Sequence, residues 1–168
     1  MINMKDIDFK ILHELMKNSK RSDRDLARQI GVSQPTVTRR RARLEEEAID
    51  NYTLIPKWLT LGYSILVITL VKLDSRTRTN ERNISERKRA LDWLMKRPQI
   101  IMGSGCTGNQ SDSFLFSVHK SYGEYDDMLR ELRRDLGDTI NDIQSILVNL
   151  EGNDVLKPLG MKYLADTE

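Results

Sequence analysis

Apolar residues in the first third of the chain recur at intervals of three and four positions. Ile7, Ile11 and Leu15 fall on one side of a helix with 3.6 residues per turn, and a polar stretch over residues 18–21 interrupts the pattern. The spacing therefore predicts a first helix that buries this stripe against its neighbours.

Two further helices are predicted from the residues at their ends. Ser22 can cap a helix over residues 23–30, and Gly31 ends it because glycine adopts the positive φ that a tight turn needs. Ser33 can cap a third helix that runs to about Glu47. The first third of the chain is thus expected to consist of three short helices.

Strand patterns begin after these helices. A short strand is predicted over Ile49–Ile55, and Pro56 and Gly62 bracket a hinge. The later elements are predicted as a strand over Tyr63–Leu73, a helix over Glu81–Arg97, strands over Ile100–Cys106 and Ser113–His119, a helix capped by Ser121, and a strand over Ile140–Leu150. This β-α-β-β-α-β order is that of the ferredoxin-like unit, an antiparallel sheet with both helices on one face.

The two patterns together predict an α+β fold, in which an N-terminal winged helix-turn-helix domain precedes a ferredoxin-like β-α-β-β-α-β domain. The expected segments are a helix-turn-helix domain over residues 1–52, a hinge over 53–62, a ferredoxin-like domain over 63–150 and a C-terminal tail over 151–168.

Charge is distributed unevenly along the chain. The net charge is only +2, but residues 1–60 carry 12 basic and 9 acidic side chains, whereas the remainder carries 15 and 16. The basic excess is concentrated in the third helix, where four of the five residues from Arg39 to Arg43 are arginines. A local basic stretch of this kind is typical of a nucleic-acid-binding surface.

Other classes of protein find little support in the composition. A single cysteine, Cys106, allows no intrachain disulfide, and the longest apolar run, Ile65–Val71, is too short to cross a bilayer. The first residues do not have the pattern of a secretion signal. We therefore expect a soluble cytoplasmic protein with no membrane partner.

The spacing in the first third matches the steric needs of a helix-turn-helix. The motif requires a small residue where its helices cross, a glycine at the turn and an apolar residue inside the second helix. Ala27, Gly31 and Val37 stand at these positions. Each feature alone is weak, but the set predicts the motif.

The third helix then carries the chemistry of a recognition helix. With Val37 and Leu44 turned inward, its first turns present polar side chains outward, as major-groove readers do. Gln34 can pair with an adenine edge and Arg39 with a guanine edge. The residues predicted to bind DNA are Ser22, Ser33, Gln34, Thr36, Thr38, Arg39 and Arg43, with Arg43 and the two helix-capping serines assigned to phosphates.

Structural interpretations of the same residues remain open. The arginines can form a solvated face paired four residues on with the acids of Glu45–Glu47, and the two serines act first as helix caps. Arg40 projects toward the first helix, so we expect it to form an ion pair with an acid there rather than to contact a base.

These residues resemble the Lrp/AsnC (feast/famine) regulators. The resemblance rests on residues 6–52, in particular on Asp8, Lys10, Ile11, Leu12, Leu15, Asn18, Arg21, Leu26, Ala27, Gly31, Val32, Ser33, Val37, Arg40, Arg43, Leu44, Glu45, Ile49 and Tyr52. The β-α-β-β-α-β order is similar to the second domain of that family. The resemblance implies a sequence-specific regulator that binds double-stranded DNA as a homodimer, with assembly into tetramers or octamers.

The resemblance also implies a small effector, commonly an amino acid. In the family it binds near the loop joining the second and third sheet strands, which is predicted here over Thr107–Asp112. Only Gly108 and, with an insertion, Asp112 match the family's loop pattern, so these are the effector-binding candidates. Arg41 occupies a position that is usually apolar in the family, and we expect its stem to lie on the core while its head reaches solvent.

Enzymatic chemistry is the competing hypothesis. Its candidates are Cys106, His13 and His119, but their spacing suits neither a metal site nor a catalytic triad, and we expect no cofactor. Some tetrapyrrole (siroheme-type) decarboxylases resemble Lrp/AsnC proteins in both domains, and there His119 would be a proton donor or ligand. Such an enzyme has little need of the outward Thr36, Thr38 and Arg39, so we predict a regulator that is not an enzyme.

Overall fold

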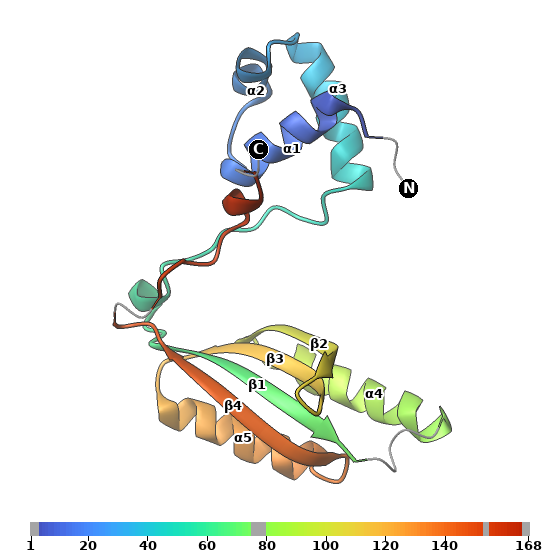
Figure 1. Cartoon of the computed structure of the whole chain (residues 1–168), viewed down its shortest axis with the longest axis vertical. Helices are drawn as coiled ribbons and strands as arrows, with labels where there is room; N and C mark the ends of the chain where they lie inside the picture. The colour runs from blue at the N-terminus through green and yellow to red at the C-terminus, as the bar shows by residue number, and fades with distance from the viewer. Residues whose placement is uncertain (1–3, 75–79, 153–154, 166–168) are drawn as a thin grey trace. The chain divides into compact units, whose positions relative to one another are not determined.

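A computed structural model describes residues 4–74, 80–152 and 155–165 of the chain. The chain forms two compact units, one of residues 1–55 with 158–168 and the other of residues 56–157. The sheet and its two helices belong to the second unit, whereas the three N-terminal helices belong to the first (Figure 1). No helix within the described residues carries an apolar stretch long enough to span a bilayer.

The first unit is built on α1 (Asp6–Lys17), α2 (Asp23–Ile30) and α3 (Gln34–Glu47), which confirms the three predicted helices. Its core consists of the buried residues Ile11, Leu15, Leu26, Ala27, Val37 and Leu44. Gly31 has φ +79° in the turn between α2 and α3, the left-handed conformation that the motif needs. The predicted helix-turn-helix is therefore present.

The predicted strand over Ile49–Ile55 is wrong. These residues form no strand, because no other segment of the described first unit offers an edge with which they could pair. No strand of a wing is thus found among described residues 4–62. Part of the predicted hinge is ordered instead as a short 3₁₀ helix, η1 (Trp58–Leu61), which ends at Gly62 with φ +81°.

The second unit has the predicted β-α-β-β-α-β order. Its elements are β1 (Ile65–Leu73), α4 (Asn80–Met95), β2 (Ile100–Gly108), β3 (Ser111–His119), α5 (Tyr122–Leu136) and β4 (Ile140–Asn149). The strands lie in the order β2-β3-β1-β4 and every neighbouring pair is antiparallel. Trp93 from α4 and Tyr125 and Leu132 from α5 pack on Val67 and Leu115, so both helices cover one face of the sheet.

The six-residue loop predicted over Thr107–Asp112 is wrong in length. β2 and β3 continue through most of it and are joined by a two-residue turn in which Asn109 has φ 47° and Gln110 has φ 56°. Two successive positive φ angles are typical of a turn whose twist matches that of a hairpin. Asn accepts this conformation readily, whereas Gln does so at a cost, which is why the sequence did not indicate a tight turn.

The C-terminal segment also belongs to the first unit. A short 3₁₀ helix, η3 (Met161–Ala165), packs against α1 and buries Ala165. This packing was not predicted from the sequence, because five residues are too few to show a periodic pattern.

Candidate nucleic-acid interface

The core of the first unit fixes which face of α3 is free. Val37 is fully buried and Leu44 nearly so, and both anchor the helix from one side. Ser33, Gln34, Thr38, Arg39 and Arg43 are exposed on α3 or at its start, and Thr36 is half-buried. The structure therefore brings the predicted α3 residues onto one outward face, whereas Ser22 lies at the start of α2.

Arg40 forms the ion pair that was predicted for it. Its Nη1 donates to Oδ1 of Asp8 at 2.8 Å, and Asp8 is only 2% exposed. Burial works to raise the pKa of Asp8, but the backbone N–H of Lys5 and the guanidinium of Arg40 hold that pKa below its usual value. This buried pair joins the start of α1 to the middle of α3 and so sets the angle at which α3 is presented.

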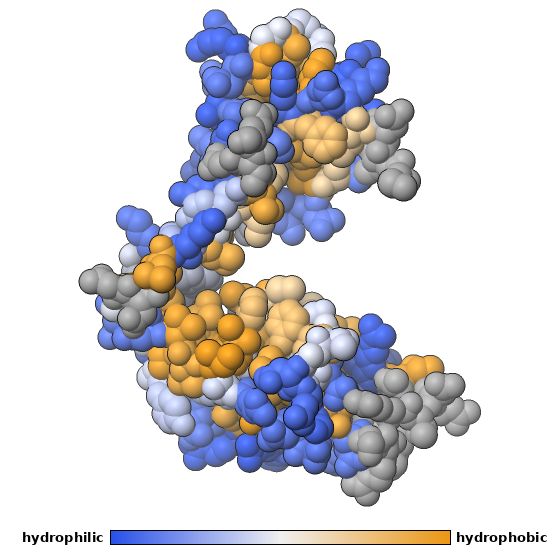
Figure 2. All heavy atoms as spheres, viewed as in Figure 1, coloured by the Kyte–Doolittle hydropathy of each residue, from blue (hydrophilic) through white to orange (hydrophobic). Residues whose placement is uncertain are grey.

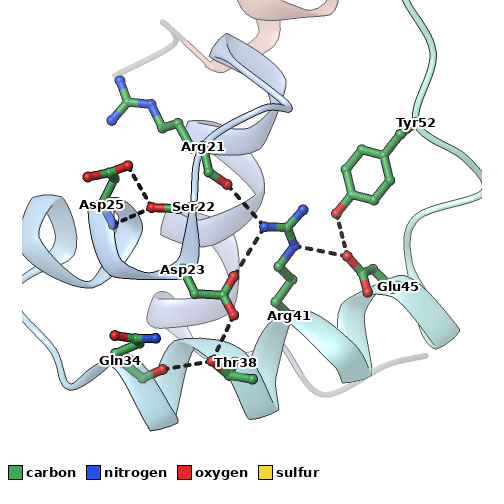
Figure 3. A network of polar contacts seen from close by, with 9 residues as sticks. All are labelled: Arg21, Ser22, Asp23, Asp25, Gln34, Thr38, Arg41, Glu45 and Tyr52. Carbon is green, nitrogen blue, oxygen red and sulfur yellow. Dashed lines mark hydrogen bonds and ion pairs between the residues drawn. The ribbon is translucent and has the colours of Figure 1, made fainter.

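Arg41 does not send its head into solvent as predicted. Its Nη1 donates to Oδ1 of Asp23 at 3.1 Å and to the backbone O of Arg21 at 3.1 Å, and its Nε donates to Oε1 of Glu45 at 2.9 Å (Figure 3). Burial works to lower the pKa of Arg41, but the bonds to Glu45 and Asp23 hold it above its usual value. The side chain is 20% exposed because these acceptors enclose its head.

Tyr52 extends this network to the segment that follows α3. Its hydroxyl donates to Oε1 of Glu45 at 2.8 Å, and the Arg41 guanidinium lies 5.4 Å from the centre of its ring. The bonds from Tyr52 and Arg41 lower the pKa of Glu45. Residues 48–52 are thereby tied to α3, although they form no strand.

Asp23 holds the start of α2 against α3 through both of its oxygens. While Oδ1 accepts from Arg41, Oδ2 accepts from Oγ1 of Thr38 at 2.7 Å (Figure 3). The Thr38 hydroxyl lies 3.1 Å from the backbone O of Gln34, a second acceptor. Neither Asp23 nor Arg41 was predicted from the sequence to be part of this site. The only signal available was the four-residue spacing of Arg41 and Glu45.

Arg39 and Arg43 differ in their partners. Nε of Arg43 lies 2.9 Å from Oε2 of Glu47, both side chains being well exposed, so the alternative interpretation of paired charges is correct for this arginine and for Arg41. Arg39 is exposed and forms no hydrogen bond or ion pair with the residues that the structure describes. Exposed pairs contribute little to stability, so Arg43 can exchange its partner for a phosphate at small cost.

The two capping serines are occupied as caps. Oγ of Ser33 accepts from the N–H of Thr36 at 3.4 Å and lies 2.8 Å from the Thr36 hydroxyl. Oγ of Ser22 accepts from the N–H of Asp25 at 3.2 Å and donates to its carboxylate at 2.6 Å, which lowers the pKa of Asp25. The Asp25 charge makes the start of α2 a poorer place for a phosphate than the start of α3, which has no acid in its first turn.

The two predicted effector residues lie at the hairpin between β2 and β3. Gly108 has φ +133° beside the turn, and Oδ2 of Asp112 accepts from the backbone N–H of Leu73 at 2.9 Å. A cavity of about 230 Å³ opens next to them, lined by other residues, among them Leu70, Lys72, Gln110, Ser111 and Gln144.

The residues considered for catalysis are apart from one another. His119 is 1% exposed in the second unit, its Nε2 lies 2.8 Å from Oγ of Ser117, and burial lowers its pKa. Cys106 is half-buried at the hairpin, where its Sγ lies 3.8 Å from the O of Ser111, and His13 is half-buried on α1 of the first unit. Within the described residues no three His, Cys, Asp or Glu side chains gather as metal ligands.

Comparison with known proteins agrees with this geometry. Residues 4–45 match the AsnC-type helix-turn-helix domain. The leucine-responsive regulatory protein of Rhizobium meliloti is 28% identical over 131 residues, which cover 77% of this chain and 80% of that protein. The HTH-type transcriptional regulator FL11 of Pyrococcus furiosus is 25% identical over 148 residues, 88% of this chain and 82% of that protein.

Solved structures show the same fold. An AsnC family transcriptional regulator from Agrobacterium tumefaciens has a TM-score of 0.76 at 22% identity, with 96% of this chain and 99% of that chain covered. The L-Met complex of a transcriptional regulator from Neisseria meningitidis has a TM-score of 0.76 at 18% identity, covering 87% of this chain and 90% of that chain. No relative or solved structure among these is a tetrapyrrole decarboxylase.

Proposed function

We propose that the chain is a DNA-binding transcriptional regulator of the Lrp/AsnC type, to which its sequence and fold are similar, and that α3 reads its operator. The proposed DNA contacts are Gln34, Thr36, Thr38 and Arg39 to base edges in the major groove, with Ser22, Ser33 and Arg43 to phosphates. In this proposal the protein acts as a regulator without enzymatic activity.

One observation carries this proposal: α3 presents an exposed guanidinium that has no partner among the described residues. Arg39 stands between the buried anchors Val37 and Leu44, on a helix fixed to α1 by the Asp8–Arg40 pair. A charged donor on a rigid support loses little conformational entropy when it meets a base edge.

The sheet supports a homodimer. Alternate residues of its strands point away from α4 and α5. Most of them are apolar, namely Leu66, Ile68, Leu70, Met102, Phe114, Phe116, Ile146 and Val148, and the polar residues Lys72, Ser104 and Gln144 lie on the same face. Figure 2 shows apolar side chains gathered over the strands on the side turned to the viewer. An apolar face of this extent is typical of a surface that a partner covers, and we propose a second copy of this chain there. The dimer would place two α3 helices in successive major grooves.

A small effector forms the last part of the proposal. A regulator with the same fold was solved as an L-Met complex, and the cavity beside Gly108 and Asp112 is lined by polar groups such as Lys72 and Gln144. A thermal-shift series with the amino acids, L-methionine included, tests it. If no amino acid raises the melting temperature, the effector hypothesis is wrong, whereas the proposal of DNA binding is unaffected.

The DNA-binding proposal is tested by selecting bound duplexes from a random pool and measuring affinities of variants for the selected site. Arg39→Ala should weaken binding by about 1–3 kcal/mol and relax the preference at one base pair. Arg43→Ala should weaken binding to all sequences evenly and reduce the slope of log affinity against log salt by about one.

Arg130→Ala is the matched control. Arg130 is an exposed arginine of α5 that pairs with Asp126 four residues away, as Arg43 does with Glu47 on α3. Its loss removes the same charge from the other unit and should leave the preference unchanged. If Arg39→Ala bound every duplex as tightly as the parent protein, the assignment of α3 would be wrong.

A further inference from the structure

Thr38 faces outward from α3, yet its hydroxyl hydrogen is already engaged within the protein. The hydroxyl has one hydrogen, and two acceptors lie within reach, Oδ2 of Asp23 at 2.7 Å and the backbone O of Gln34 at 3.1 Å. The shorter bond goes to a carboxylate, and bonds to an ionised acceptor are the stronger ones. While the hydrogen is held by Asp23, none is left to donate outward, whereas the longer bond to Gln34 alone would hold it less firmly.

Asp23 is in turn held in place. Its second oxygen accepts from Arg41, which is itself fixed by the backbone O of Arg21 and by Glu45 (Figure 3). The Asp23 and Arg41 side chains are 22% and 20% exposed, so the pair is partly shielded from water. The carboxylate therefore keeps its orientation toward Thr38 while the outer face of α3 stays free.

We propose that Asp23 makes Thr38 an acceptor-only reader of base edges, which rests on the proposed placement of α3 in the major groove. In that groove the exocyclic amino groups of adenine and cytosine donate, whereas N7 and O6 of guanine and O4 of thymine only accept. Thr38 then hydrogen-bonds an amino group and offers nothing to a purine N7. Thr38 is a specificity-determining residue, and Asp23, which acts through it, is a positioning residue.

The proposal is tested on the selected site with base analogues and the parent protein. At the base pair read by Thr38, removal of the exocyclic amino group should weaken binding roughly three- to tenfold, as expected for one neutral hydrogen bond. Replacement of N7 of the purine by carbon should have no effect that depends on Thr38. With Thr38→Val, which keeps the shape and removes the hydroxyl, the loss caused by removing the amino group should vanish.

Two carboxylate variants distinguish the effect of the Asp23–Thr38 hydrogen bond from the effect of removing a negative charge. Asp23→Ala and Asp25→Ala each remove one negative charge from the first turn of α2, but Asp25 bonds Ser22 rather than α3. The coupling is the part of the affinity loss on removing the base amino group that depends on the Thr38 hydroxyl. It should fall in Asp23→Ala and persist in Asp25→Ala. The analogue measurements on the parent protein stand even if Asp23→Ala fails to fold.

The outcomes distinguish this inference from the proposed function. If loss of a purine N7 weakens binding only while the Thr38 hydroxyl is present, then Thr38 donates and the inference is overturned. If no base shows coupling to Thr38 while Arg39→Ala still relaxes a preference, the inference fails and the proposed function stands. If the parent protein enriches no sequence at all, both fail.

Discussion

At the residue scale, the buried Asp8–Arg40 pair is the contact that orients α3. The Asp8 side chain is 3% exposed and that of Arg40 16%. Nε of Arg40 is buried with no partner among the described residues. Each charge was removed from water on folding, so each depends on the other to offset the cost.

Removal of one member of the pair should therefore destabilise the first unit strongly. Asp8→Leu leaves the Arg40 guanidinium buried without its carboxylate, and we expect a loss of about 3–5 kcal/mol. Amide hydrogen exchange in α1 and α3 measures it, because both tryptophans lie outside this unit. The double variant with Arg40→Met should recover most of the loss. Equal instability of the single and double variants would contradict a coupled pair.

The positions of some of these side chains could be predicted from the sequence, but most of their partners could not. Helical periodicity places Arg40 on the side of α3 that faces α1, and Asp8 is an acid at the start of that helix, so their pairing could be predicted. The partners of Arg41 and Thr38 could not, because Asp23 comes from another helix and the choice among rotamers depends on the packing of all three. Periodicity gives the face of a helix and leaves the hydrogen bond undetermined.

At the scale of elements, residues with strong conformational preferences were the best guides. Ser22, Ser33 and Ser121 cap the helices predicted from them, and Gly31 makes the predicted turn. The failures occurred where pairing or an unfavourable conformation decides the outcome. The segment Ile49–Ile55 has strand-forming residues but no partner, and the hairpin turn contains Gln110 at a positive φ.

A substitution in the turn between β2 and β3 should therefore be able to stabilise the second unit. Gln110 has φ 56°, which costs a residue with a Cβ more than it costs glycine. Gln110→Gly should raise the stability of the second unit by up to about 1 kcal/mol, since the relief exceeds the added freedom of the unfolded chain. Gln110→Val should lower it. Denaturation followed by the fluorescence of Trp93, a core residue of this unit, measures both. A stabilising Gln110→Val would contradict the turn.

At the scale of the whole molecule, the two compact units carry different proposed functions. The first carries the exposed arginines of α3 and the second carries the apolar sheet face. Because a dimer ties two DNA-binding units together, binding of the first to DNA raises the effective concentration of the second. Dimerisation and operator affinity should therefore be lost together.

A charged residue introduced on the apolar face of the sheet should dissociate the proposed dimer. Ile68 lies in the central strand with Phe116 and Ile146 beside it, so Ile68→Glu places a carboxylate in the middle of the proposed interface. Sedimentation should show a monomer, and affinity for a two-half-site duplex should fall at least tenfold. Leu91→Glu is the control, since Leu91 is 54% exposed on α4. A stable dimer of Ile68→Glu would place the interface elsewhere.

Photocrosslinking measures whether α3 touches bases in the bound complex. A photoreactive phenylalanine derivative is introduced in place of Gln34, the exposed first residue of α3, and separately in place of Gln29, an exposed residue of α2 in a hollow shared with α1 and η3. We expect crosslinks from position 34 to bases within the selected site and none from position 29. Crosslinks to bases from position 29, with none from position 34, would contradict this expectation.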